Sequence, residues 1–444
     1  PYSFHHHLRN GDEVMIMVLE EVKKRNLKNI TIAPSAIFPN NEIIAEMIEN
    51  GNITNIYTNY LNGKASTAIT KGLLQGMLVM DTHGGRARAI ATGEIKIDCC
   101  FVAAPTADKN GNCNGIDGPS ACGALGYIIP DTRFAKHKVV ITDNLVEKLD
   151  YIEVDAKYID YVIKVDAIGD AAGIVSGTTN ITRDPLGLKI AYDTAILLNE
   201  LGFIKEGFSM QTGAGGTSLA VTNEVRKIML DKGIKASFAS GGITGFFVEM
   251  LEEGLINDLY DVQCFDLKAV KSYRDNPNHH GMSSSVYANP YDPKVIVNKL
   301  DFVILGATEI DINFNVNVTT SSMGDIIGGS GGHADAAHGA DLTILTTNLL
   351  KSRLPIIREK VHTITTPGED VDILVTERGI AINPIRKDIL KKLEGSKLNI
   401  VPIEKLLNLA HSIAGIPKQL VGSDKVVGVV RYRDGTIIDS LYQK

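Results

Sequence analysis

Along about the first 170 residues, the spacing of hydrophobic positions alternates between a helical period and the pattern of short strands. The stretch DEVMIMVLEEVKKRN (12–26) has apolar residues at 14, 15, 18, 19 and 22, which is the stripe of a core-facing helix. Short β-branched runs predict strands at 29–33, 55–61, 99–105, 138–145 and 161–168. Strands that alternate with helices of this length predict an α/β fold with a mostly parallel sheet under helical cover.

The second half of the chain repeats this pattern. TSLAVTNEVRKIMLDKG (217–233) predicts a helix, SFA (237–239) predicts a short strand, and a further helix is expected to end near Gly254. AEMIENGNITNIY (45–57) and VEMLEEGLINDLY (248–260) align without gaps, with acidic, apolar and glycine positions in common. We therefore predict two homologous α/β domains, residues 1–195 and 196–444.

Composition and charge limit the possible functions. The net charge of −7 argues against nucleic acid as the main partner, because neutralising phosphates requires a basic face. No run approaches the roughly 18 apolar residues that span a bilayer, and no secretory signal is visible. The five cysteines contain no C-x-x-C pair, so we expect buried reduced thiols in a cytoplasmic protein.

Two loops stand at corresponding places in the predicted domains, SFHHHLRNGD (3–12) and MQTGAGGTSLA (210–220). In the second loop, Gly213, Gly215 and Gly216 would let the backbone approach a ligand closely, and the helix that follows offers free N–H groups. The spacing fits neither the P-loop nor the dinucleotide fingerprint. Contact with an anion or acyl chain and a plain turn therefore both remain open.

A third stretch, HGGRARAIATGE (83–94), places Arg86 and Arg88 beside paired glycines. Planar guanidinium groups suit the recognition of carboxylates. If the stretch were extended, alternation would put both side chains on the same face. Solvated surface arginines are the alternative.

The stretch LGATEIDINFNVNV (305–318) reads as one strand with Glu309 and Asp311 on the same face. Two carboxylates on one face of a buried strand are unfavourable unless they are used or paired. The pattern therefore predicts either a chemical role or an exposed strand face.

The most unusual segment follows directly, GDIIGGSGGHADAAHG (324–339). Its composition is compatible with a phosphate-binding loop, a flexible loop, or a metal site built from His333, Asp335 and His338. No further cluster of Cys, His or carboxylate residues completes a metal site of known spacing, so we predict no metal.

The sequence around these residues resembles a known family. ATEIDINFNVNVTTSSMGDIIGGSGGHADAAHGA (307–340) is similar to the segment of CoA-transferases in which a strand glutamate precedes a G-x-G-G loop. Glu309 falls on the position of the catalytic glutamate, the segment 329–332 on the glycine loop, and Asp335 on an aspartate that follows it. The resemblance implies two CoA-transferase-like (NagB/RpiA-type) domains, in agreement with the repeat.

Within the CoA-transferases the similarity is closest to the citrate lyase alpha subunits. SFHHHLRNGD, LNGKAS (61–66) and THGGRARAI carry it, and it extends over nearly the whole chain. The segment that this family has before SFHHH is expected to be missing. The glutamate of other CoA-transferases is followed by D-x-x-G, whereas this chain has D-I-N-F. Three roles therefore stay open for Glu309: a nucleophile, a residue that only positions substrate, or a structural relic.

The resemblance implies a reaction and its partners. The expected activity is transfer of an acyl-carrier thioester from acetyl-ACP to citrate, which gives citryl-ACP and acetate. The expected substrate is an acyl thioester of CoA or of the phosphoribosyl-dephospho-CoA group of a carrier protein, with no tightly bound cofactor. The expected partners are the citrate lyase beta subunit and the gamma acyl carrier subunit, and a homo-oligomer is expected. The alternatives are a free-standing CoA-transferase for short organic acids, an effector-binding module and a sugar-phosphate isomerase.

The resemblance and the residue chemistry together select the site residues. Glu309 is predicted to be the catalytic carboxylate, and Gly331 and Gly332 are predicted to donate N–H groups to oxyanions. Arginines should meet the anionic citrate, with Arg86 and Arg88 as the first choice. The full set of predicted substrate and CoA contacts is Gly213, Gly215, Gly216, His5, His6, His7, Arg9, Arg86, Arg88, Gly329, Ser330, His333 and Asp335.

Overall fold

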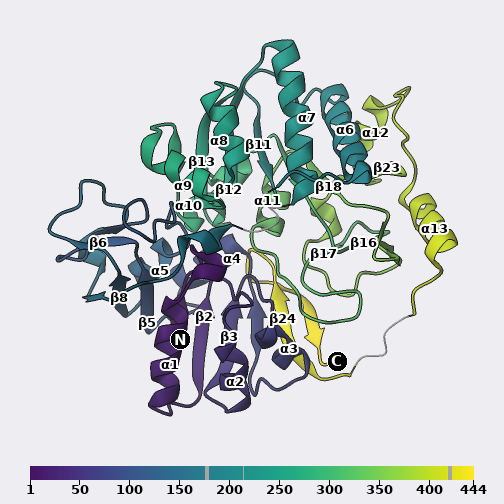
Figure 1. The fold of residues 1–444 in the computed structure, drawn as a ribbon. Helices are drawn as coiled ribbons and strands as arrows, with labels where there is room; N and C mark the ends of the chain where they lie inside the picture. Colours follow the sequence, from purple (N-terminus) through teal and green to yellow (C-terminus); the bar gives the residue numbers. More distant parts are fainter. Residues whose placement is uncertain (176–179, 214, 419–422) are drawn as a thin grey trace.

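The computed structural model describes residues 1–175, 180–213, 215–418 and 423–444. These residues form two large sheets with helices packed against them, and Figure 1 shows one sheet in the lower half of the view and the other in the upper half. The α/β class and the mostly parallel strands are confirmed. No helix in the described parts of the chain is long and apolar enough to cross a membrane.

The first sheet has nine strands in the order β10-β8-β5-β1-β2-β3-β4-β24-β25, and only its last pair is antiparallel. Its strands are β1 (Tyr2–Phe4), β2 (Ile30–Pro34), β3 (Ile53–Thr58), β4 (Leu78–Met80), β5 (Cys99–Ala103), β8 (His137–Thr142), β10 (Tyr161–Lys164), β24 (Val426–Arg431) and β25 (Ile437–Tyr442).

The second sheet has eight strands in the order β14-β13-β12-β11-β15-β18-β22-β23, and again only the last pair is antiparallel. Its strands are β11 (Ser209–Thr212), β12 (Ala236–Ile243), β13 (Ile256–Cys264), β14 (His279–Gly281), β15 (Phe302–Leu305), β18 (Thr343–Thr346), β22 (Ile373–Thr376) and β23 (Gly379–Ile382).

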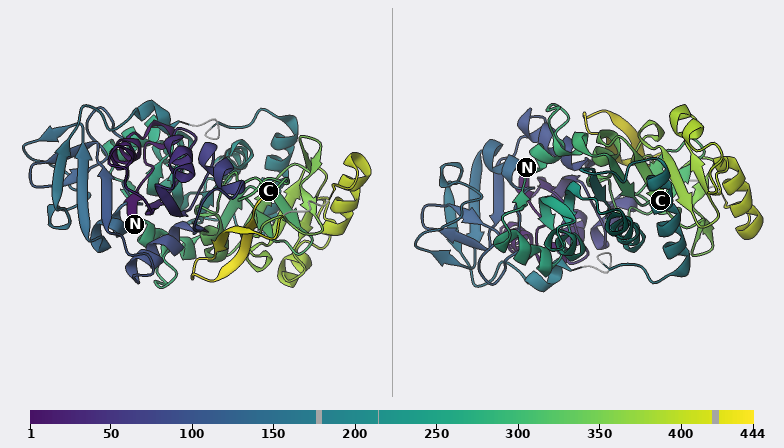
Figure 2. Two further views of the ribbon diagram at one scale, coloured as in Figure 1. Left: turned by 90° about the horizontal axis from the view of Figure 1, so that it is seen from below. Right: turned by 90° about the horizontal axis from the view of Figure 1, so that it is seen from above.

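Helices cover both sheets, and short strands form small sheets beside them, as the two views in Figure 2 show. The helices are α1 (Val14–Lys24), α2 (Ile43–Glu49), α3 (Lys64–Thr70), α4 (His83–Ala91), α5 (Ile129–Phe134), α6 (Pro185–Glu200), α7 (Gly216–Lys232), α8 (Gly245–Glu252), α9 (Leu267–Asp275), α10 (Ser284–Ala288), α11 (His333–Gly339), α12 (Lys387–Lys392) and α13 (Ile403–Ala414). The short strands are β6 (Thr106–Asp108), β7 (Cys113–Asn114), β9 (Leu145–Val146), β16 (Glu309–Asp311), β17 (Val316–Asn317), β19 (Leu350–Lys351), β20 (Leu354–Pro355) and β21 (Ile357–Arg358).

The predicted repeat appears as the same local structure in both halves. Helix α2 is followed by a glycine turn and strand β3, and helix α8 is followed by a glycine turn and strand β13. Gly51 and Gly254 sit in these turns with φ angles of 68° and 70°. Left-handed backbone of this kind favours glycine, which explains why both copies keep it.

The predicted second domain, residues 196–444, differs from the structure at its start and at its end. The expected boundary at 195/196 lies inside the continuous helix α6. The C-terminal hairpin β24–β25 pairs with β4 and so extends the first sheet (Figure 1, yellow). The chain therefore returns to the first unit after completing the second.

The two sheets share one hydrophobic core. The largest buried cluster contains residues of both, for example Val102 of β5 and Phe302 of β15. All five cysteines are free, and four of them are buried, as the sequence predicts. Because the halves pack through a common core, loops from both sheets are held at a fixed position between them.

Candidate functional site

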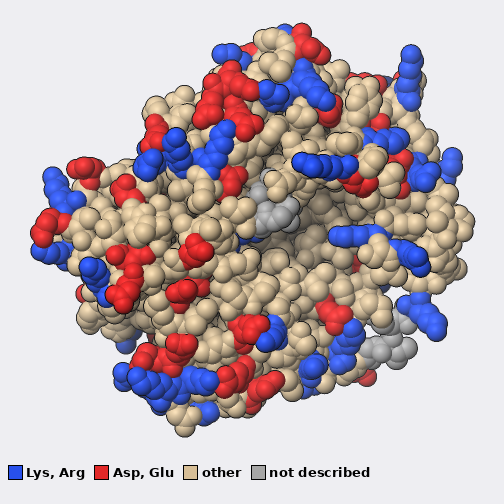
Figure 3. Space-filling model, viewed as in Figure 1, with Lys and Arg blue, Asp and Glu red and all other residues tan. Residues whose placement is uncertain are grey.

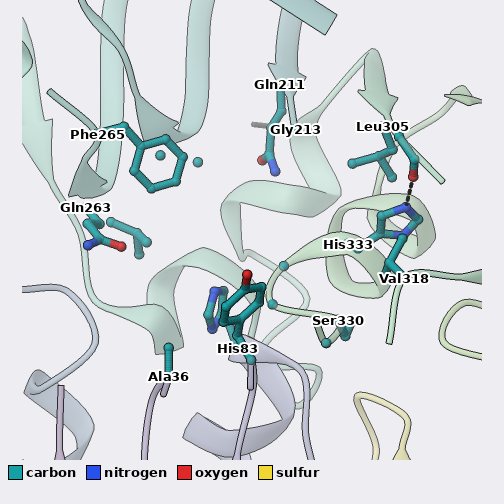
Figure 4. Close-up of a pocket in the computed structure, with 18 of the residues that line it drawn as sticks. Ala36, His83, Gln211, Gly213, Gln263, Phe265, Leu305, Val318, Ser330 and His333 are labelled. Atoms are coloured by element: carbon teal, nitrogen blue, oxygen red, sulfur yellow. Dashed lines mark hydrogen bonds between the residues drawn. The ribbon is translucent and has the colours of Figure 1, made fainter. Parts of the chain in front are cut away.

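A cavity of about 450 Å³ lies where the carboxyl ends of the two parallel sheets meet (Figure 4). The loops after β1, β2, β3 and β4 line it from one side, and those after β11, β13 and β15 from the other. Ligands of open α/β sheets bind at such edges because the strand ends leave side chains and backbone groups free. Figure 3 shows the surface hollowed near the middle of this face, between the halves.

Half of the predicted contact and catalytic residues line this cavity. They come from the loop after β1, the loop after β11 and the glycine-rich loop before α11, and they are His6, Arg9, Gly213, Gly329, Ser330, Gly331, Gly332 and His333. The sequence thus located three separate segments of the same cavity wall.

Arg9 is the only Lys, Arg, Asp or Glu residue among the described residues that line the cavity. Its guanidinium carbon lies 5.5 Å from the ring centre of Phe38 and 4.9 Å from that of Phe265, so two aromatic faces hold it. Its backbone has a φ of 53°, a conformation that non-glycine residues seldom adopt without a reason. Burial lowers the pKa of Arg9, but a guanidinium remains charged at neutral pH. The Nη1 atom is buried and has no partner among the described residues.

Of the three adjacent histidines, only His6 lines the cavity. His5 accepts a hydrogen bond from the Ala103 N–H at 2.8 Å, and its Nδ1 contacts Nδ1 of His7. His7 accepts from the Tyr127 N–H at 3.4 Å. His5 and His7 therefore form a supporting layer and do not face the cavity, which corrects their predicted role as contacts. Burial lowers the pKa of His5 to about 3 and the pKa of His6 and His7 well below its ordinary value, so all three are neutral.

The glycine-rich loop packs closely against the first half of the chain. Gly331, at a φ of 52°, donates its N–H to the Asn59 carbonyl at 3.1 Å, and its own carbonyl accepts from the His83 N–H at 2.8 Å. A Cβ at Gly329 would lie 2.3 Å from the Asn59 carbonyl oxygen, and one at Gly332 would lie 2.6 Å from Tyr287 Oη. The glycines are thus required by contacts within the protein.

These bonds contradict the prediction that the Gly331 N–H is free to stabilise an oxyanion, because it already has an acceptor. The Gly332 N–H donates to no described residue, so its predicted role stays a prediction.

His333 fixes the same loop. Its Nε2 lies 2.9 Å from the Gly306 carbonyl and its Nδ1 lies 2.8 Å from Thr366 Oγ1 (Figure 4 shows the ring and its dashed bond). Nε2 must therefore carry the proton, and Nδ1 accepts from the threonine. Burial lowers the pKa of His333 to about 4, which keeps it neutral. The structure therefore assigns His333 to fixing the loop, although the residue also lines the cavity.

Asp335 does not face the cavity. Its carboxylate is fully buried and accepts hydrogen bonds from Thr82 Oγ1 at 2.9 Å and from the Gly84 N–H at 2.8 Å. Arg433 lies 3.6 Å away. Asp335 therefore ties the glycine-rich loop to the start of α4, and its predicted substrate contact is corrected to this role. His333, Asp335 and His338 do not form a cluster of metal-ligand atoms among the described residues, and His338 contacts Asp370 at 2.9 Å.

Arg86 and Arg88 also lie outside the cavity lining, which corrects the first choice for citrate. The stretch that would place both side chains on one face if it were extended is instead the helix α4, in which residues two apart point in nearly opposite directions. Arg86 makes two hydrogen bonds to Asp131, at 2.9 and 2.7 Å, with both side chains buried. Arg88 is paired with Glu94 on the other side of the helix.

The predicted strand 305–318 is broken into separate pieces. β15 ends at Leu305, and β16 and β17 form a small hairpin beside the second sheet. Asp311 binds the turn of this hairpin by accepting from the N–H groups of Asn313 and Asn315, both at 3.0 Å. Its role is therefore local.

Glu309 begins β16 directly behind Thr308, which lines the cavity, but it is itself only 2% exposed. Its Oε2 accepts from Asn317 Nδ2 and from the His362 N–H, both at 3.0 Å. Its Oε1 lies 3.0 Å from Arg358 Nε. The carboxylate is therefore occupied by protein partners, and its predicted catalytic role stays a prediction.

Gly215 and Gly216 start helix α7, and they do not line the cavity. A Cβ at Gly216 would lie 2.9 Å from the Asn180 carbonyl oxygen, so this glycine allows two chain segments to pack. Only Gly213 of the predicted trio faces the cavity, and Ala214 lies outside the described residues.

Several cavity residues were not singled out from the sequence. The rings of His6 and Tyr127 stack at 4.7 Å, and those of His83 and Tyr127 lie 4.4 Å apart. Gln211 donates from Nε2 to Tyr287 Oη at 2.8 Å, and its Oε1 is buried without a partner among the described residues. These residues come from four distant segments, so no local pattern groups them.

One cluster outside the cavity has the composition of a metal site. The ligand atoms of Asp261, Cys264 and His279 lie within 4.8 Å of one another and are buried. The Cys264 thiol donates to Asp261 Oδ2 at 2.9 Å, and the His279 ring contacts Asp261 at 3.2 Å and Ser272 at 3.0 Å. We interpret the cluster as a hydrogen-bond network that ties β13 to β14.

Comparison with known proteins shows the family of this chain. All of residues 1–444 match the model of the family described as citrate lyase, alpha subunit. The chain belongs to the citrate lyase alpha subunit family. It is 43% identical over 442 residues to the citrate lyase alpha chain of Klebsiella pneumoniae and to that of Haemophilus influenzae, covering 99% of this chain and 87% and 88% of theirs.

One solved structure agrees with this family, and a more distant one shares only the fold. A crystal structure described as the alpha subunit of citrate lyase from Streptococcus mutans, in complex with citrate, is 44% identical, has a TM-score of 0.97, and is covered to 87% by the whole of this chain. A malonate decarboxylase alpha subunit from Acinetobacter baumannii shares the fold with a TM-score of 0.68 at 14% identity, over 94% of this chain and 89% of that one.

Proposed function

We propose that this chain transfers the acyl-carrier thioester from acetyl-ACP to citrate, giving citryl-ACP and acetate, as the transferase subunit of citrate lyase. Family membership supports this role, and the relative from Streptococcus mutans was solved with citrate. The observation that carries the proposal is Arg9, a half-buried arginine whose buried Nη1 has no partner among the described residues, in a cavity whose described lining contains no carboxylate.

The cavity chemistry suits an organic anion. A guanidinium binds a carboxylate through charge-assisted hydrogen bonds, and partial burial strengthens them because water screens the charges less. His6 and His83 are neutral because burial lowers the pKa of both, so they add hydrogen-bonding capacity without charge. Citrate carries three carboxyl groups, of which one can be held by Arg9 while another reacts.

The reaction requires activation of a carboxylate, which is a poor electrophile. In the first step, a carboxylate oxygen of citrate attacks the carbonyl carbon of the acetyl thioester, the C–S bond breaks, and the thiolate leaves with the electron pair. The product is an acetyl–citryl anhydride. The thiolate then attacks the citryl carbonyl carbon, the bond from this carbon to the bridging oxygen breaks, and acetate leaves with that oxygen and the electron pair. No proton is consumed, so positioning and oxyanion stabilisation are the main requirements.

Glu309 is assigned a positioning role in this scheme. Its contacts with Arg358, Asn317 and the His362 N–H fix β16, and Thr308 beside it lines the cavity. Glu309→Gln should lower turnover, and hydroxylamine should trap no acyl group on the protein. Recovery of a Glu309 hydroxamate after incubation with the acetyl donor would establish a nucleophilic role instead.

The proposal includes the molecular partners. The thioester is carried by a phosphoribosyl-dephospho-CoA group on a gamma acyl carrier subunit, and a beta subunit cleaves citryl-ACP. The complex is cytoplasmic, contains several copies of this chain, and needs no tightly bound cofactor.

The test is an assay of the purified chain with labelled citrate and either the acetylated carrier protein or acetyl-CoA. Citryl thioester formation with a strong preference for citrate over other short organic acids is expected. A free-standing CoA-transferase would use acetyl-CoA with monocarboxylate acceptors at least as well as citrate. Absence of citryl thioester with both donors would refute the proposed function.

A further inference from the structure

His83 occupies a distinctive position in the cavity. It is the first residue of α4, next to the N-cap Thr82, and its backbone N–H joins the first half of the chain to Gly331 of the glycine-rich loop. A Cβ at Gly331 would lie 3.4 Å from His83 Nε2, so the glycine leaves the ring accessible beside the loop. Figure 4 shows His83 pointing into the middle of the cavity.

The ring of His83 is held in place without using its nitrogen atoms. Its ring centre lies 4.4 Å from that of Tyr127 and 6.2 Å from that of His6. Nδ1 is buried without a partner, and neither ring nitrogen forms a hydrogen bond to a described residue. An oriented polar group without a protein partner is unfavourable unless a ligand supplies one.

Among the other candidates for stabilising an oxyanion, the Gly332 N–H has no acceptor among the described residues and remains available beside His83, whereas the following groups are already committed. The N–H of Gly331 donates to the Asn59 carbonyl. Both nitrogen atoms of His333 have partners, the Gly306 carbonyl and Thr366 Oγ1. Arg9 is required for the carboxylate of the substrate.

We propose that His83 donates a hydrogen bond from its neutral imidazole to the oxyanion that forms when the thioester carbonyl is attacked. This inference rests on the proposed function and assigns a catalytic residue to it. When the citrate oxygen bonds to the carbonyl carbon, the π electron pair moves to the carbonyl oxygen, and the imidazole N–H stabilises that charge. The pair returns as the C–S bond breaks, and the proton stays on His83 throughout.

A neutral donor agrees with the surroundings of His83. Burial lowers the pKa of His83 to about 3, and the charge of Arg86 contributes to the same shift. The neighbouring His6 is neutral as well. A neutral imidazole keeps its N–H over the whole working range, whereas a general acid would need to be protonated.

The experiment compares kcat and citrate KM of wild type, His83→Ala and His83→Gln between pH 5.5 and 8. His83→Ala should lower kcat about 100- to 1,000-fold, as loss of one oxyanion donor does, with citrate KM within about threefold of wild type. His83→Gln retains a neutral N–H donor and should recover at least about tenfold of the lost kcat. His137→Ala, at an exposed position on β8, is the matched control and should leave kcat unchanged.

The outcomes separate the inference from the proposed function. Wild-type turnover with a kcat that varies little with pH and depends on His83 supports both. Wild-type turnover that His83→Ala retains within threefold overturns the inference and leaves the function intact. A kcat that falls with rising pH in wild type but not in His83→Gln shows acid catalysis and overturns the neutral-donor role. Absence of wild-type turnover overturns both. Melting curves of each variant show whether a loss of kcat reflects unfolding.

Discussion

Replacing Arg9 by glutamine should raise the KM for citrate far more than the KM for the acetyl donor. Arg9 supplies the only formal charge of the described cavity lining, and its Nη1 has no partner among the described residues. A hydrogen bond to a charged group contributes about 1.5–3 kcal/mol, and about 1.4 kcal/mol corresponds to a factor of ten in affinity. The expected rise in citrate KM is therefore roughly 10- to 150-fold, with little loss of stability.

The assay is steady-state transfer to labelled citrate, with both substrates varied. Arg9→Lys keeps the charge but loses the planar group held between Phe38 and Phe265, so it should recover only part of the affinity. Arg25→Gln, on an arginine side chain 70% exposed after α1, is the control and should leave both KM values unchanged. A citrate KM within threefold of wild type in Arg9→Gln, or equal rises for both substrates, would refute the reasoning.

Three further predictions concern stability. Asp131→Asn should destabilise the protein by about 3–5 kcal/mol in denaturant titration, because it leaves the buried Arg86 charge without its partner. Burial raises the pKa of Glu153 to about 7, so the folded state retains a proton that the unfolded state loses above pH 4.5. Stability therefore falls as pH rises from 4.5 to 7. In Glu153→Gln the melting temperature should fall less over this pH range than in wild type. Gly241→Ala, at a φ of 106°, should destabilise more than Gly207→Ala, at a φ of 76°, because only Gly241 has close neighbours.

Each stability prediction has a result that contradicts it. Asp131→Asn should keep the wild-type citrate KM in its folded fraction, and a large KM rise would return Arg86 to the substrate site. Glu147→Gln, which removes an exposed ion pair, should cost at most about 1 kcal/mol in the same titration. An unchanged slope of melting temperature against pH in Glu153→Gln would mean that other buried groups cause the fall. Equal losses of stability in Gly241→Ala and Gly207→Ala would show that backbone strain, and not the close neighbours of Gly241, sets the cost.

The sequence predicted the fold class because both periodicities were strong and the pattern recurred. Helix α1 and the strands β2, β3, β5, β8 and β10 of the first sheet follow from local patterns, and so does the repeated helix–glycine–strand unit around Gly51 and Gly254. The short strands β1 and β4 of the same sheet were not predicted. The return of β24 and β25 to the first sheet could not be predicted, since strand pairing over several hundred residues leaves no local signal.

The site was predicted in part for the same reason. Gly213 and the loop 329–333 were found because glycine-rich segments stand out in a sequence, and Arg9 because of its neighbouring histidines. The expectation for Arg86 and Arg88 failed because it assumed an extended stretch, whereas α4 sends the two side chains to different partners. Tyr127, Gln211 and Tyr287 reach the cavity only through tertiary packing, and a lone tyrosine or glutamine carries no pattern that marks it. His83 begins the stretch HGGRARAIATGE, but a single histidine before two glycines has no pattern that marks a site.

The most direct test of the account is a crystal structure of this chain grown with citrate. We expect citrate in the cavity between the two sheets, with one carboxylate within about 2.7–3.2 Å of the Arg9 guanidinium and another carboxyl group on the side of His83 and Gly331. Citrate bound at Arg86 or Arg88, or at any position that leaves Arg9 without a carboxylate, would contradict the central claim.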